Sequence, residues 1–145
     1  MARSTFSGPV MSQAGFMTEP RYIFATDVIA GQVQIEATGT YIILSAADGG
    51  PSSETKFVLP EVVSGSFSLS SQPADQRYNG AQGTLINYGA QAHVLKGFGT
   101  QPVNGDADGV VVPAAHVVQW GGNGNQAAPW VAAEMALCTG YTPSP

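Results

Sequence analysis

The sequence predicts an all-β fold: a β-sandwich or a jelly-roll or barrel-like domain with an extended N-terminal arm. Short runs rich in β-branched and aromatic residues recur along the 145 residues, as is typical of strands. Stretches containing Gly, Asn and Pro separate these runs, and no run continues as an apolar stripe with the helical period. The length fits one domain, which we expect to comprise residues 21–145, with a short extended C-terminal tail, after an arm of residues 1–20.

The arm differs from the rest of the chain. Residues 1–20 mix small polar residues with Gly, Pro and isolated apolar side chains, and they follow neither the strand nor the helix period. Terminal segments of this kind become ordered when something holds them. We expect neighbouring molecules to do so; an arm folded back on its own domain is the alternative. The candidate contact residues are Arg3, Phe6, Val10, Met11, Phe16, Met17 and Arg21.

The body of the chain is organised around residues 41–60, where an apolar strand, a polar loop and a second strand follow one another. Residues 48–53 favour a turn, and Pro60 ends the second strand because it has no N–H to donate. Polar and apolar residues alternate at residues 32–37, which indicates a strand with one solvent-exposed face and one buried face. We predict strands at 22–25, 32–37, 41–44, 56–59, 62–63, 66–69, 84–87, 93–96, 110–112, 116–120 and 130–137.

The last predicted strand has a competing interpretation. The composition of residues 130–137 would also suit a helix. Pro129 and Trp130 follow a glycine-rich loop at residues 121–125, and this favours a strand.

Composition limits the function classes. Charged residues make up 10% of the chain, against about 25% in typical soluble domains, so we expect much of the surface to meet other chains. The net charge of -5 argues against a nucleic-acid partner, which needs a basic patch. No apolar run approaches the length of a membrane span, and no Sec-type signal opens the chain. Cys138 is the single cysteine, so we expect no internal disulfide and synthesis in a reducing cytoplasm.

No residue pattern indicates an enzyme. The two histidines, His93 and His116, lie in apolar strands, and Cys138 stands in a near-terminal context without a nucleophile motif. We therefore expect both histidines to be half-buried or interface residues, and the chain not to be an enzyme.

Two loops resemble parts of ligand-binding motifs. Asn104, Asp106, Asp108 and Gly109 match the first half of a calcium loop, but Ala115 stands where the final glutamate is needed. An Asx-rich hairpin loop is the preferred interpretation. The loop at residues 121–125 lacks the Lys-Ser or Lys-Thr of a phosphate-binding loop. We expect neither a metal nor another cofactor.

Three aromatic residues are candidates for a recognition surface. Trp120 and Trp130 bracket the glycine-rich loop, and with Tyr78 they could stack on a sugar. Buried anchors of a β core or of a subunit interface are the simpler interpretation of the two tryptophans.

The opening of the chain resembles that of small structural proteins of tailed bacteriophages. The residues that carry this resemblance are Thr5, Phe6, Ser7, Gly8, Pro9 and Val10, followed by Ser12, Gly15 and Phe16. Residues 41–60 are similar to the β modules that follow such openings. Ile86-Asn87, Val103-Asn104-Gly105 and Trp130 fit the same plan.

The resemblance implies a capsid decoration (cement) protein on the outside of a virion. Its partners would be the major capsid protein, whose adjacent subunits it bridges and stabilises, and copies of itself in a homotrimer. The arm residues named above would then bind capsid or neighbouring subunits. A receptor- or glycan-binding module of a phage head or tail fibre is the alternative, and burial of both tryptophans would count against it. The chain has no long repeat that could form a fibre shaft.

Overall fold

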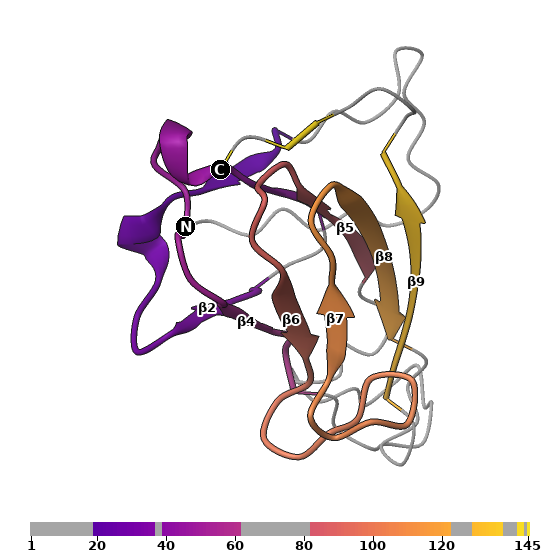
Figure 1. Cartoon of the computed structure of the whole chain (residues 1–145). Coiled ribbons are helices and arrows are strands. Elements are labelled where there is room, and N and C mark those ends of the chain that lie inside the picture. Colours follow the sequence, from indigo (N-terminus) through magenta and orange to yellow (C-terminus); the bar gives the residue numbers. More distant parts are fainter. Residues whose placement is uncertain (1–18, 37–38, 62–81, 123–128, 138–141, 144) are drawn as a thin grey trace, which may run out of the picture.

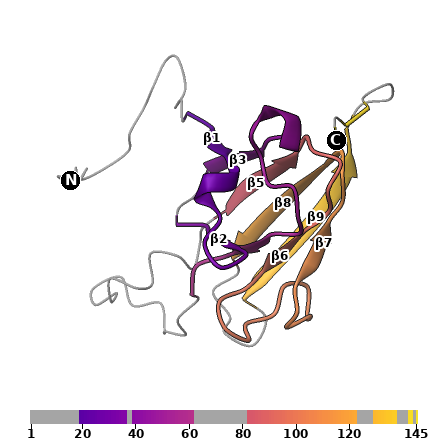
Figure 2. The same ribbon diagram turned by 60° about the vertical axis from the view of Figure 1, so that its left-hand side comes forward.

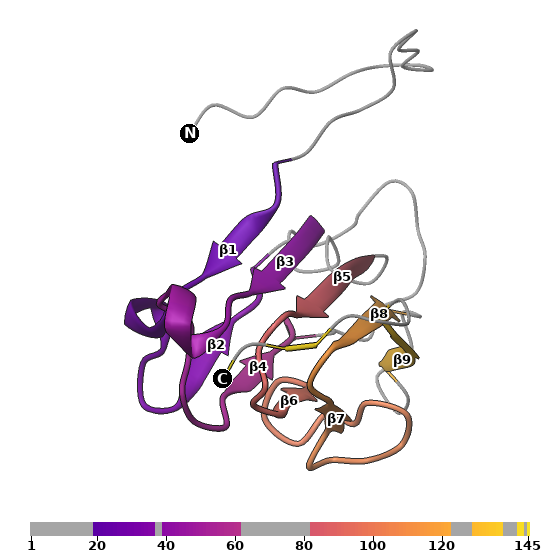
Figure 3. The same ribbon diagram turned by 45° about the horizontal axis from the view of Figure 1, so that its top comes forward.

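Nine strands form two mixed sheets in the computed structural model, which describes residues 19–36, 39–61, 82–122, 129–137, 142–143 and 145. The five-stranded sheet, sheet A, has the order β1 (Arg21–Ile23), β3 (Gly39–Ile43), β5 (Gln82–Asn87), β8 (His116–Gly122) and β9 (Trp130–Ala136). The four-stranded sheet, sheet B, has the order β2 (Gln32–Gln34), β4 (Lys56–Val58), β6 (His93–Lys96) and β7 (Val110–Val112). Figure 1 shows sheet B in front, and the two sheets appear as two rows of strands in Figure 3.

The chain alternates between the sheets from β1 to β6. Strands two apart in sequence therefore become parallel neighbours: β1, β3 and β5 in sheet A, and β2, β4 and β6 in sheet B. The last three strands run antiparallel to their neighbours, β7 beside β6, β8 beside β5 and β9 beside β8. Figure 2 shows the resulting fan of sheet A.

The two strands within residues 41–60 lie in different sheets, β3 in sheet A and β4 in sheet B. Their connection contains a short 3-10 helix, η2 (Ala46–Asp48), where the sequence pattern predicted only a polar loop. Ser45 caps this helix by accepting a hydrogen bond from the Asp48 N–H at 3.2 Å, and Gly49 ends it with φ 88°. The loop therefore passes from one sheet to the other instead of closing a hairpin.

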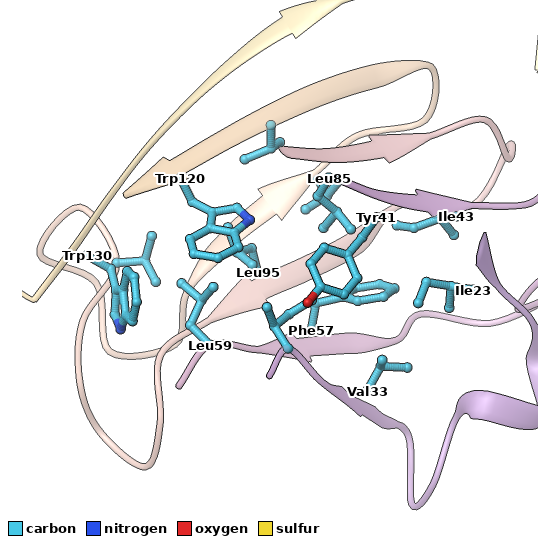
Figure 4. Packing of buried hydrophobic residues seen from close by; sticks show 14 residues of the cluster. Ile23, Val33, Tyr41, Ile43, Phe57, Leu59, Leu85, Leu95, Trp120 and Trp130 are labelled. Atoms are coloured by element: carbon cyan, nitrogen blue, oxygen red, sulfur yellow. The ribbon is translucent and has the colours of Figure 1, made fainter. Parts of the chain in front are cut away.

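Inward-facing side chains of both sheets form one core (Figure 4). Period-two alternation places Tyr41 and Ile43 on the inner face of β3, and Phe57 on the inner face of β4. The buried cluster consists of Ile23, Val33, Ile35, Tyr41, Ile43, Phe57, Leu59, Leu85, Leu95, Val103, Val112, Val118, Trp120 and Trp130. Most of these residues belong to the runs from which the strands were predicted.

The all-β prediction is confirmed, and residues 130–136 form a strand and not a helix. Several predicted strand boundaries were wrong. Ala25 begins the 3-10 helix η1 (Ala25–Asp27), and β8 continues through Gly121 and Gly122, which pair with β9. The predicted strands at 62–63 and 66–69, and the arm up to residue 18, lie outside the described residues. Among the helices that are described, none is long and apolar enough to span a membrane.

Candidate interaction surface

The outer face of sheet A is defined by strand alternation and register. Side chains along a strand point to opposite faces. Tyr41, Leu85 and Val118 are buried in the core and aligned across the sheet, so their sequence neighbours point away from it. The register then assigns residues from all five strands to the outer face.

One row of this face is apolar from edge to edge. Tyr22 pairs with Ile42, Ile42 with Ile86, Ile86 with Val117, and Val117 with Met135. The two ends are well exposed, Tyr22 at 51% and Met135 at 59%, whereas the three central residues are half-buried. Cross-strand neighbours of this kind contact one another, so the five residues form a continuous apolar row.

The remaining outer residues of sheet A are uncharged. A second row contains Thr40, Thr84, Gln119 and Ala133, and a third contains Gln82, Gly121 and Val131. None of these outward-facing strand residues carries a charge, in a chain whose net charge is -5. We call the three rows together the neutral face.

The neutral face lies partly on parallel strands, and this makes its exposure unusual. Parallel strands are normally covered on both faces. In sheet A the inner faces of β1, β3 and β5 lie on the core, and in the described part of the chain no helix or strand packs on the outer face (Figure 2). An exposed apolar row on such a sheet is typical of a surface that binds another protein.

The outer face of sheet B is different. Lys56 and Lys96 point outward from adjacent strands, beside Val94 and Val58. Gln34 on β2 bends over Val58: its amide donates hydrogen bonds to the backbone oxygens of Val58 at 2.9 Å and Ile35 at 3.0 Å. This face therefore carries two positive charges, and part of its apolar surface is covered from within the chain.

Both tryptophans lie in the core, which confirms the preferred interpretation of them as buried anchors and contradicts the alternative in which they form a recognition surface. Trp120 is 3% exposed and Trp130 is 1% exposed, and their rings meet edge to face with centroids 5.6 Å apart (Figure 4). Neither indole N–H has a hydrogen-bond acceptor within the described part of the chain. The two rings therefore act through buried apolar area, and neither can stack on a sugar. Tyr78 lies outside the described residues.

His93 is a core residue. It is 1% exposed, its Nδ1 accepts a hydrogen bond from the Thr55 N–H at 3.1 Å, and its ring meets Phe57 edge to face. Because Nδ1 is an acceptor, the neutral ring carries its proton on Nε2. Burial lowers the pKa of His93 to about 4.

The second histidine, His116, lies on a different strand from His93. His116 is half-buried at the start of β8, and its Nδ1 lies 2.9 Å from the Ala114 oxygen. Cys138 lies outside the described residues.

The loop with the partial calcium motif is tied into the fold by hydrogen bonds. Asp106 Oδ1 accepts the Asp108 N–H at 2.8 Å. Asn104 accepts the Ala132 N–H at 2.8 Å and donates to the Ala132 oxygen at 2.9 Å. These side chains thus complete an Asx-type turn and attach it to β9, as the preferred interpretation of the loop requires.

The predicted arm contacts are described only in part. Arg21 is exposed at the start of β1. Arg3, Phe6, Val10, Met11, Phe16 and Met17 lie outside the described residues. The sequence pattern did not indicate Ile42, Ile86, Val117 and Met135 as site residues, because only the register of the strands reveals that they share a row.

Comparisons of this chain with protein-family models, with curated proteins and with solved structures found no match.

Proposed function

We propose that this chain is a non-catalytic assembly module that docks on a larger protein shell through the neutral face. The observation that carries this proposal is the apolar row of Tyr22, Ile42, Ile86, Val117 and Met135 on an uncharged, uncovered sheet face. Burial of apolar surface stabilises such a contact by about 25 cal/mol per Å². A face without charge adds no desolvation cost for ions.

The size of the neutral face favours many copies acting together. Five strands span about 19 Å and the five residues of β3 about 16 Å, roughly 300 Å² of flat sheet. A standard interface buries about 800 Å² per partner, so one face alone supports only weak binding. Repeated copies on a symmetric shell would raise the overall affinity by avidity.

These properties suit a bacteriophage capsid decoration protein. In this proposal the two mixed sheets form a sandwich-type body and three copies form a trimer on the capsid exterior. The trimer bridges adjacent subunits of the major capsid protein, and contacts made by the arm add to those of the neutral face. The shell then resists internal pressure because more contacts must break together.

Copy number in purified phage particles tests this function. Quantitative mass spectrometry of particles that contain this chain should find hundreds of copies per particle, in a fixed ratio to the major capsid protein. A handful of copies per particle would indicate a fibre component, and absence from the particles would overturn the proposal.

A further inference from the structure

The second half of β9 is an open sheet edge. β9 is the last strand of sheet A, and its register with β8 places Glu134 opposite Val118 and Ala136 opposite His116. Leu137 donates its N–H to the Ala115 oxygen, so the odd-numbered residues of this strand bond to β8. The N–H and C=O groups of the even-numbered residues therefore point outward, away from the sheet.

The first half of this edge is closed by the loop after Val103. Asn104 donates its N–H to the Trp130 oxygen at 3.0 Å, and its side chain bonds both backbone groups of Ala132. Asn104 thus occupies the position of one residue of an added strand. The outward backbone groups of Glu134 and Ala136 have no such partner in the described part of the chain.

A cleft of about 380 Å³ lies beside the open half of the edge, between β9 and β7. Val110, Val118 and Ala132 give it apolar walls, and Glu134 is the charged residue that lines it. Natural proteins usually protect exposed edges, because unpaired strand groups recruit another strand. Here the protection stops at Ala132, next to an apolar cleft, and this combination suits an extended peptide that adds to the sheet.

We propose that residues 1–18 of a neighbouring copy add as a strand to the open edge of β9, with Arg3 beside Glu134. Arg3 is the only charged side chain in these 18 residues, so it complements the charge in the cleft. Isolated apolar residues of the arm, Phe6 and Val10 among them, would fill the apolar part. The proposal concerns assembly of the chain with itself and does not depend on capsid binding.

A neighbouring copy fits better than the same chain because of where the arm is attached. The arm leads into β1, and β1 and β9 are opposite edges of sheet A, four strand spacings or about 19 Å apart. Copies placed side by side bring the β1 edge of one next to the β9 edge of the next, whereas the arm must first cross sheet A to reach the β9 edge of its own chain. Donor and acceptor are different surfaces, so the contact is head to tail, and it closes into a ring such as a trimer when the rotation from one copy to the next permits closure.

Charge reversal on the full-length chain tests the pair. Light scattering after gel filtration should show an oligomer for the natural chain, and Arg3→Glu or Glu134→Arg should each weaken assembly about tenfold or more. The double variant should recover most of that loss, and Glu54→Arg, a matched change at an exposed loop position, should have no effect. A monomeric natural chain, or losses that add in the double variant, would overturn the proposal.

The oligomeric state of the natural chain separates exchange between copies from folding back, and a mixing experiment tests whether the arm of one copy occupies the edge of another. One variant lacks residues 1–18 and keeps the edge; the other carries Glu134→Pro, which removes an outward N–H, blocks the edge and keeps the arm. Native mass spectrometry should find each variant monomeric alone and a 1:1 complex after mixing. If the arm-deleted variant assembles like the natural chain, or if the mixture stays monomeric, the proposal fails.

Discussion

The outer faces of the two sheets differ although both sheets follow the same alternation. The neutral face of sheet A carries an apolar row and no charge, whereas the outer face of sheet B carries Lys56 and Lys96. Both inner faces supply the same core. The few charged side chains of the chain are therefore distributed unevenly, and the neutral face carries none of them.

The difference between the two outer faces corresponds to two environments, contact with water and contact with another protein. A face that only meets water needs charge to remain soluble and to discourage association. A face that is covered in its working state needs apolar and neutral side chains. The comparison predicts that changes on inner faces affect stability, and that changes on the neutral face affect association.

The largest stability contrast should come from neighbouring residues of β9. Trp130 fills the core, while Val131 points outward and is well exposed. Trp130→Ala should lower the free energy of unfolding by about 3–5 kcal/mol, and Val131→Ala by less than about 1 kcal/mol. Urea unfolding followed by circular dichroism measures both, and equal losses would contradict the assignment of the two faces.

Acidification should destabilise the domain through the inner face of sheet B. The pKa of His93 is about 4 in the fold, below the value of about 6.5 in the unfolded chain. The unfolded chain therefore binds more protons below pH 6.5, so stability is full above that pH and falls towards pH 4. The loss should reach roughly 3 kcal/mol below pH 4.

The control for this pH dependence is His93→Gln, which keeps an acceptor near the Thr55 N–H but does not titrate. The difference in unfolding free energy between pH 7 and pH 4 should shrink in this variant by about the same 3 kcal/mol. An unchanged pH dependence would show that His93 is not the responsible group.

A smaller contrast should come from two glycines of sheet A. A Cβ on Gly83 would lie 2.4 Å from a ring carbon of Trp120 and 2.6 Å from the Gly39 oxygen, whereas Gly121 has no atom within 4 Å of that position. Gly83→Ala should cost about 1–3 kcal/mol of stability, and Gly121→Ala should stay within about 0.5 kcal/mol. Thermal unfolding of the two variants measures the difference, and equal melting temperatures would refute it.

The sequence was sufficient to locate most of the described strands, but not the 3-10 helices η1 and η2 or the arrangement of the strands. Short apolar runs with turn residues on both sides located β6 and β7 with their observed bounds. The alternation of the chain between two sheets could not be inferred, because parallel neighbours such as Tyr41 and Leu85 lie far apart in sequence. Short propensity signals carry no information on such pairings.

For the candidate site, the sequence likewise predicted the general feature but not the residues that form it. Composition predicted a surface that meets other chains, but the residues of the neutral face escaped notice. Ile42 and Ile86 stand in continuous apolar runs, where sequence alone does not separate the inner face from the outer. Trp120 and Trp130 border a polar loop, which left a surface role open as an alternative, and they pack against each other in the core as the simpler interpretation predicted.

The most direct test of the account places the same charge on the two outer faces. Ile86 and Val94 are both half-buried, outward-facing residues of inner strands, Ile86 on β5 and Val94 on β6. Binding to capsids that lack this protein should weaken about 30-fold or more for Ile86→Lys, as for a hot-spot residue. It should change less than about threefold for Val94→Lys. Equal binding by the two folded variants, or a larger loss for Val94→Lys, would contradict the claim that the neutral face is the docking surface.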